Sequence, residues 1–327
     1  MIQVIFAGRT LLPEYRHGNA RQLDITGVIF SLTAMLPFIY GLTELSRNNL
    51  QLIPILSIIS GLIFGIAFVY RERTIANSLL DFNLFTNRAF RVTLIPMLLT
   101  AVIMGGIALF MAQYLQMVMG FSPFYAGLWM IPQAIGMIIG LMVVSAIAKR
   151  IRPGFIITTG LLISTIGMLL IAYVPVIKGL VFLVIGFVTA VIGVSPILVL
   201  GTGIIIGSAP QEKAGAAASI SETGNQLGIA LGVALLGSIG AFIYHKRIEK
   251  NIPGGLSIEA WKAAHESIVG ATSVASGIDD QHRVMLVISA KEAFVNGLHI
   301  VAMVGAFTFE FQICFTAIGL RKVGTVN

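Results

Sequence analysis

A polar stripe interrupts one of the most apolar stretches of the chain. Asn225 and Gln226 follow Glu222 by three and four residues, and Ser219 precedes it by three. On an α-helix, residues at this spacing lie on one face. A carboxylate there can bind a proton or attract a cation, and the two amides can hydrogen-bond a small molecule. Glu222 is therefore a candidate functional residue, and Asn225 and Gln226 are candidates for lining a substrate cavity.

The same stretch carries a second pattern, made of small residues. Gly224, Gly228 and Gly232 recur at every fourth position, roughly opposite the polar stripe. Glycines at this spacing let a neighbouring membrane helix approach closely. The two patterns predict a helix over 215–244 that packs through its glycine face and turns its polar face toward water or substrate.

The depth of Glu222 in this helix favours a functional role. About seven residues precede it, which places it roughly 10 Å inside a hydrocarbon layer about 30 Å thick. Ionisable residues at such depth are costly and usually face a bundle interior or a cavity. The alternative is that Glu222 is a neutral hydrogen-bonding group between two helices. Glu310, the other acid deep in an apolar run, is expected to be such a group in the last helix.

Composition indicates a membrane protein. Of the 327 residues, 57% are hydrophobic and 11% are charged, with a mean hydropathy of +0.93, which excludes a soluble globule. The net charge of +7 lies in short clusters between apolar runs, so it indicates orientation in the bilayer and not nucleic-acid binding. Because Cys314 is the only cysteine, an internal disulfide is excluded. No metal site and no cofactor are expected.

The apolar runs predict an all-α integral membrane protein. Runs of about twenty residues favour helices over the shorter, alternating strands of a barrel. Residues 1–7 resemble the tail of a span whose beginning is missing. Eight transmembrane helices are then expected, at 25–45, 51–70, 92–115, 125–148, 154–175, 179–205, 215–244 and 296–320.

Basic residues in the loops predict the orientation. The loops at one end hold 13 Lys or Arg, whereas the opposite short loops hold two, Arg47 and Lys178. Cytoplasmic loops carry such an excess. Both termini are therefore expected to be cytoplasmic, and the long loop 245–295 external.

One segment of this external loop has helical periodicity. Ile258, Trp261, Ala264 and Ile268 recur at helical spacing after Ser257, which indicates a short amphipathic helix. Two placements stay open: a lid packed over the outer mouth, or an interfacial helix anchored by the tryptophan.

A second cavity element is expected around Pro132. This proline and the following Gly136 and Gly140 predict a bend in a membrane helix, and Gln133 adds a polar group at the same place. Trp129 offers an aromatic face to a cation. Gln133 and Trp129 complete the candidates for the substrate cavity.

Five stretches together carry a family resemblance. They are L-L-P-E-Y-R (11–16), L-F-T-N-R-A-F (84–90), Y-L-Q-M-V-M-G-F-S-P-F-Y-A-G-L (114–128), A-G-A-A-A-S-I-S-E-T-G-N-Q-L-G (214–228) and A-F-V-N-G-L-H (293–299). In this order they resemble the fourteen-helix drug/proton antiporters of the major facilitator superfamily, especially the QacA/SmvA-type quaternary-ammonium efflux proteins.

The resemblance implies a domain organisation. Residues 1–24 would be the remnant of a preceding span and a cytoplasmic loop. Residues 25–91 would be two extra central transmembrane helices and a cytoplasmic loop, and 92–327 the carboxy-terminal six-helix half of the transporter, one half bundle. The amino-terminal half would be absent. The resemblance also places the chain in the inner membrane of a bacterium.

The resemblance also implies roles for single residues. Glu222 matches a carboxylate that the family uses in coupling and cation recognition. Ser221, Gln226 and Met137 stand where the quaternary-ammonium branch has further acids. Fewer negative charges favour monovalent lipophilic cations, or mixed substrates, over divalent cations.

Three hypotheses of function remain to be compared. The leading one is efflux of lipophilic, cationic drugs or antiseptics in exchange for protons, with the bilayer, the drugs and the protons as partners. A membrane enzyme is disfavoured, since the sequence has no H-E-x-x-H, G-x-S-x-G or P-loop. The alternative is a non-transporting fragment or partner subunit that needs a separate amino-terminal half, because alternating access requires two bundles.

Overall fold

The computed structural model describes residues 25–47, 52–74, 82–176, 178–250, 252 and 257–320, and its regular structure is helical throughout these ranges. The expected span remnant and loop at 1–24, and the chain from 321 onward, lie outside the described residues. The helices are α2 (Ile25–Arg47), α3 (Leu52–Thr74), α4 (Arg88–Gln113), α5 (Pro123–Trp129), α6 (Ile131–Ile147), α7 (Pro153–Ala172), α8 (Leu180–Gly207), α9 (Ala214–Ile248), α10 (Ile258–Glu266), α11 (Ile268–Ala275) and α12 (Asp280–Gly319).

Seven helical segments in the described part of the chain are long and apolar enough to cross a membrane. They correspond to α3, α4 with a π-helical turn at Tyr114–Val118, α5 with α6, and α7, α8, α9 and α12. In α2 the apolar part is the shorter segment Ile25–Gly41. An all-helical membrane protein is thus confirmed, whereas an eighth span stays a prediction.

Two expected helices have different ends in the structure. The last helix begins at Asp280 and not at residue 296. Charged residues end the apolar run, but they do not end the helix, which can continue in water. Asp279 caps this start, and its carboxylate accepts a hydrogen bond from the backbone N–H of His282 at 3.3 Å. The span expected at 125–148 is divided at Met130, just before Pro132, into α5 and α6.

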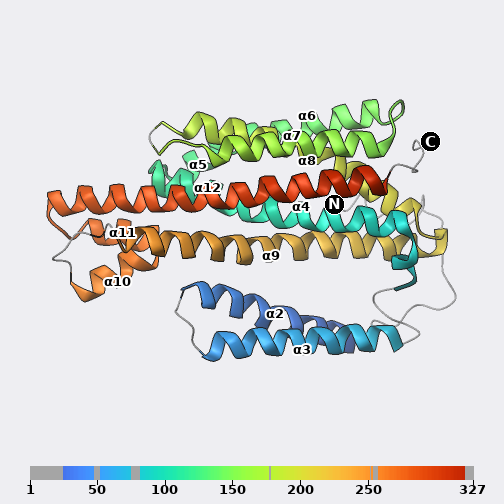
Figure 1. The fold of residues 1–327 in the computed structure, drawn as a ribbon, viewed down its shortest axis with the longest axis horizontal. Coiled ribbons are helices and arrows are strands. Elements are labelled where there is room, and N and C mark those ends of the chain that lie inside the picture. Colours follow the sequence, from blue (N-terminus) through green and yellow to red (C-terminus); the bar gives the residue numbers. More distant parts are fainter. Residues whose placement is uncertain are drawn as a thin grey trace, which may run out of the picture.

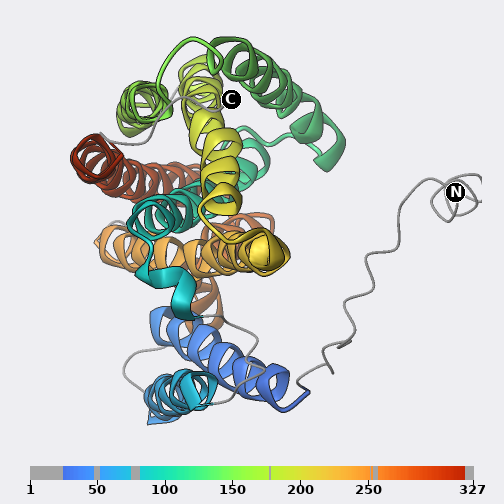
Figure 2. The same cartoon turned by 90° about the vertical axis from the view of Figure 1, so that its right-hand side faces the viewer.

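Helix α4 runs through the middle of the main bundle. It packs against α8, α9 and α12, while α7 lies between α8 and α12, and α6 lies on the outer side of α8. The α2–α3 pair packs on α9 at one side of this bundle (Figures 1 and 2). The helix that carries the polar stripe therefore has the bundle on one side and the α2–α3 pair on another.

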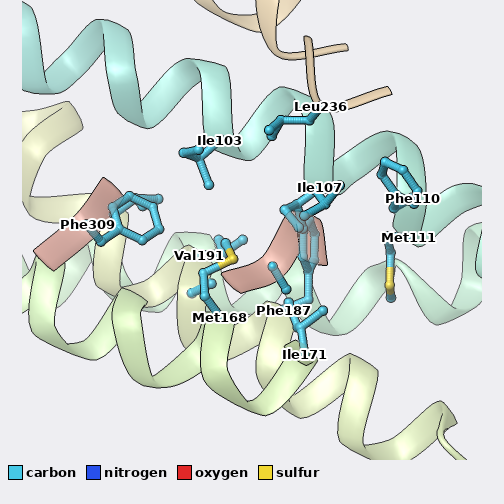
Figure 3. Close-up of a cluster of buried hydrophobic side chains, with 14 of the residues drawn as sticks. Ile103, Ile107, Phe110, Met111, Met168, Ile171, Phe187, Val191, Leu236 and Phe309 are labelled. Atoms are coloured by element: carbon cyan, nitrogen blue, oxygen red, sulfur yellow. The ribbon is translucent and has the colours of Figure 1, made fainter. Parts of the chain in front are cut away.

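The core lies where α4, α7, α8 and α12 meet. Ile107 of α4, Met168 of α7, Phe187 of α8 and Phe309 of α12 point toward one another there, and each is almost fully buried (Figure 3). Burying such large apolar side chains inside the protein gives dense packing and holds the four helices in a fixed arrangement.

The two ends of the bundle differ in charge. The end of α3, the α6–α7 turn and the start of α9 lie at one end of the bundle, on the right in Figure 1. These segments carry Arg73, Arg150 and Lys213, and we call this end the basic end. Helices α10 and α11 lie at the opposite end, which we call the outer end. At the basic end, the Asn87 side chain joins the start of α4 to the end of α8: its amide donates a hydrogen bond to the carbonyl of Ser208 at 2.8 Å.

Helix α10 is fastened to the end of α9 by a hydrogen bond and a ring stack. Its cap is Ser257, whose hydroxyl accepts from the backbone N–H of Ala260 at 3.1 Å. The Tyr244 hydroxyl of α9 donates to the carbonyl of Ala264 at 2.9 Å. The His265 ring stacks on Trp261 at 4.8 Å and on His245 of α9 at 4.9 Å, between ring centroids.

This arrangement modifies the expectation for the external amphipathic helix. Ala264 and Ile268 are buried, but Ile268 belongs to α11, and Ile258 is exposed. Trp261 is in contact with a histidine of the same helix. The packed face of α10 is therefore shorter than the spacing predicts, since the helix ends at Glu266.

Candidate functional site

Helix α9 brings its glycines against α4. A Cβ at Gly228 would stand 2.7 Å from the Cβ of Ala101, and one at Gly232 would overlap the carbonyl oxygen of Val102. Gly105 of α4 has the reciprocal position, since a Cβ there would stand 2.7 Å from the carbonyl oxygen of Ile229. Gly224 is looser, with Leu94 at 3.8 Å. Two of the three glycines thus lie at a contact that excludes any side chain.

A cavity of about 680 Å³ opens beside this contact, between α4, α6, α8 and α9. Most of its wall is apolar, with Met104 from α4, Met137 from α6 and Phe187 from α8. Helix α9 contributes Asn225 and, one and two turns further along, Ile229 and Val233. We call this space the central cavity. Its size and lining suit a small hydrophobic molecule.

Three polar side chains reach the wall of the central cavity. They are Thr100, Gln133 and Asn225. The Oε1 atom of Gln133 is buried and has no hydrogen-bond partner among the described residues. A ligand or a water molecule that donates a hydrogen bond would satisfy this oxygen, because buried polar groups are otherwise costly. No carboxylate or basic group belongs to the described residues that line the cavity.

Glu222 lies one turn of α9 before Asn225, on the same face as Ile229 and Val233. Its side chain is exposed and does not line the central cavity. The amide Nε2 of Gln226 donates a hydrogen bond to Oε1 of Glu222 at 2.8 Å. The exposed carboxylate is therefore held beside Gln226, one turn of α9 from the cavity residue Asn225.

Two other candidates for the substrate cavity, Gln226 and Trp129, do not line the central cavity. Gln226 is exposed and bonds Glu222, and does not line the cavity. Trp129 is also outside, because it ends the short helix α5 and stacks on Phe121 with ring centroids 6.4 Å apart. Glu310 is exposed on α12 and has no hydrogen bond to a described residue. The expected bond from Glu310 to an adjacent helix is not formed among the described residues and stays a prediction.

One polar contact near the cavity escaped the sequence reasoning. The Thr100 hydroxyl donates to Oε1 of Gln312 at 3.0 Å, and both side chains are buried. They lie on α4 and α12, far apart in the chain. The available signal was the presence of a polar residue inside each apolar run, since such residues commonly bond across membrane helices.

The geometry combines an uncharged cavity with an exposed carboxylate one turn away from it along α9. In surroundings of low dielectric constant a carboxylate attracts a cation far more strongly than in water. A proton on the same carboxylate removes that attraction. The cavity can therefore hold a small hydrophobic molecule, and its described lining supplies no charge of its own.

Comparisons with known proteins agree with a membrane transporter. A family model described as Major Facilitator Superfamily matches residues 25–233. The multidrug efflux pump LfrA of Mycolicibacterium smegmatis is 32% identical, over 98% of this chain and 64% of that protein. The tetracenomycin C resistance and export protein of Streptomyces glaucescens is 25% identical, over 91% and 56%. The methyl viologen resistance protein SmvA of Salmonella typhimurium is 25% identical, over 87% and 57%.

A solved structure has a similar fold. It is the inward-facing, unoccupied crystal structure of a bacterial homologue of the human lysosomal transporter Spinster, with a TM-score of 0.54 and 15% identity. The match covers 90% of this chain and 67% of that chain. At this identity the likeness concerns the fold alone. This chain spans less than two thirds of the length of each of the three curated relatives.

Proposed function

The chain belongs to the Major Facilitator Superfamily, and on that premise we propose that it takes part in exporting hydrophobic, cationic compounds across a bacterial cell membrane in exchange for protons. Relatives named for multidrug efflux, tetracenomycin C export and methyl viologen resistance support the class of transport. The observation that carries the proposal is the position of Glu222, one turn from an uncharged cavity of about 680 Å³.

Competition for one negative charge explains the exchange. With Glu222 ionised, a cation in the central cavity gains a favourable interaction with the carboxylate. A proton that arrives at Glu222 cancels this charge, and the cation leaves. The hydrogen bond from Gln226 fixes the carboxylate in either case, since a carboxyl oxygen accepts in both states. Asn225 and Gln133 add hydrogen-bonding groups for substrates that carry them.

The proposal includes an arrangement in the membrane. The basic end would face the cytoplasm, with both termini there, because cytoplasmic loops carry the excess of Lys and Arg. Helices α2 and α3 would be two additional central spans, giving eight in total. The segments from α4 to α12 would form one six-helix half of a fourteen-helix transporter of the QacA/SmvA type.

The experiment follows drug export by this chain under two conditions. Proteoliposomes with an imposed pH gradient would contain the chain alone, or the chain with the part of LfrA that it does not match. Export of the lipophilic cation ethidium is the readout. We expect gradient-driven export in the second preparation, and its loss with Glu222→Gln, because an amide does not ionise and so cannot carry the coupled proton.

Glu310→Gln is the matched control, since it changes another exposed carboxylate in a membrane helix. Its export should equal that of the unmodified chain. Unchanged export with Glu222→Gln would refute the coupling role. Export by neither preparation would favour the alternative, that this chain is a non-transporting fragment or requires a different partner.

A further inference from the structure

A second hollow lies on the side of α9 away from the central cavity. It has a volume of about 600 Å³ and is bounded by α2, α3 and α9. Leu227 and Leu231 of α9 form its inner wall. These leucines stand two residues from Asn225 and Ile229, which places them on nearly the opposite face of the helix. We call this space the α2–α3 groove.

Small residues of α2 and α3 leave the space that forms the groove. At Gly61 the helices α2 and α3 touch, since a Cβ there would stand 2.7 Å from the carbonyl oxygen of Ala34. One turn later, at Gly65, a Cβ would meet only the Cβ of Ala34, at 3.9 Å. The two helices therefore diverge beyond Gly61, toward the basic end.

The groove has the length of one leaflet and a single basic end. The residues of α3 that line it run from Gly61 to Arg73, about 18 Å at 1.5 Å per residue. One leaflet of the hydrocarbon core is about 15 Å thick. Tyr70 and Arg73 end the groove, one turn apart, and both are exposed. Apart from this end the described lining is apolar and carries no negative charge.

We infer that the α2–α3 groove binds an anionic phospholipid. One acyl chain lies between α9 and the α2–α3 pair, and the phosphate contacts Arg73 and the Tyr70 hydroxyl. A guanidinium matches a phosphate in geometry and charge, and basic pockets between membrane helices bind lipid headgroups of this kind. A cationic substrate is the weaker candidate, because the described lining contains a basic residue, Arg73, and no acidic one.

The test uses the purified, delipidated full chain and vesicles of phosphatidylglycerol and phosphatidylcholine in equal amounts. Either lipid carries a photoactivatable group on the same acyl chain, and labelled peptides are mapped by mass spectrometry. We expect phosphatidylglycerol to label peptides around Gly65 and Leu231 more than phosphatidylcholine does. Arg73→Gln should reduce that labelling by about fivefold, the effect of one basic residue near a membrane surface, and leave phosphatidylcholine labelling unchanged.

A second variant fills the groove and keeps its charge. Gly65→Leu has room at its Cβ and should lower labelling by both lipids. The controls are Gly203→Leu, where a Cβ meets nothing within 4 Å, and Arg150→Gln, which removes another exposed arginine at the basic end. Thermal unfolding of each variant confirms folding. Equal labelling by the two lipids, labelling that persists in Gly65→Leu, displacement by tetraphenylphosphonium, or crosslinks to a second copy would each overturn the inference.

Discussion

The hydrogen bond between Thr100 and Gln312 joins α4 to α12 in the buried part of the bundle. Thr100→Val keeps the shape of the side chain and leaves the Gln312 amide without its donor. We expect the free energy of unfolding to fall by about 1–3 kcal/mol, the cost of an unsatisfied buried polar group. Thermal unfolding in detergent measures the change.

Two further variants separate the lost bond from the lost hydroxyl. Thr100→Val combined with Gln312→Leu should recover most of the stability, because both polar groups are then removed. Thr308→Val should have little effect, since among the described residues that half-buried hydroxyl bonds only the Val304 carbonyl of its own helix. A double variant less stable than Thr100→Val alone would contradict the explanation.

At the residue scale, the sequence could predict which side chains share a face but not what that face meets. Asn225 and Gln226 are adjacent, so they differ by about 100° around the helix. The central cavity lies on the side of Asn225, and Gln226 bonds Glu222. Which of the two lines the cavity depends on the positions of α4, α6 and α8. Spacing along one helix does not contain that information.

At the scale of the helix pair, the α4–α9 contact makes a sharp prediction about two glycines. Gly232→Ala should destabilise the protein by about 1–3 kcal/mol or prevent folding, because its Cβ overlaps the Val102 carbonyl and would push the helices apart. Gly224→Ala adds the same methyl group where Leu94 is 3.8 Å away. It should be neutral or slightly stabilising, since alanine favours a helix by about 1 kcal/mol over glycine. Equal effects in thermal unfolding would contradict the close contact.

The fastening of α10 to α9 should depend on pH. Burial lowers the pKa of His265 below its usual 6.5, and His245 lowers it further, whereas Glu249 opposes the shift. The packed state therefore disfavours protonation of His265. The packing has its full stability above pH 6.5 and weakens as the pH falls from there through the lowered pKa. The protection factors of the α10 amides, which are exchange rates corrected for the intrinsic effect of pH, should fall on acidification.

The variant His265→Phe provides the control for this pH effect. It preserves an aromatic ring for the stack on Trp261 and removes the titrating group. The protection factors of the α10 amides should then change much less on acidification over the same range. An unchanged acid response would assign the effect to another titrating group near α10, such as His245 or Glu249.

The ends of the helices show the limit of reading apolar runs. Hydropathy predicts the part of a helix inside the bilayer, and it located each span from α3 to α9 to within a few residues. It missed the first part of α12, because charged residues such as Lys291 and Glu292 suit a helix in water as well as a loop. Hydropathy also did not predict that the span divides at Met130, although Pro132 indicated a bend nearby.

At the scale of the whole molecule, alternation of apolar runs and basic loops was enough to predict a helical membrane bundle with unlike ends. The two hollows beside α9 could not be predicted in the same way. Each depends on helices distant in sequence, such as α6 with α9 or α3 with α9. A glycine pattern indicates close approach at one place, but the space left elsewhere follows from how the helices diverge.

The unlike ends lead to a prediction about orientation in the cell. In a Cys314→Ser background, Glu259→Cys places a thiol in the first turn of α10, and Arg150→Cys places one in the α6–α7 turn at the basic end. Both positions are exposed. A membrane-impermeant maleimide should label Glu259→Cys in intact cells and Arg150→Cys only after permeabilisation, because the basic end is expected inside. Labelling of both from outside would contradict a bundle that crosses the membrane between them. The reverse pattern would preserve the fold and invert the proposed orientation, and Glu222 would then lie nearer the external face.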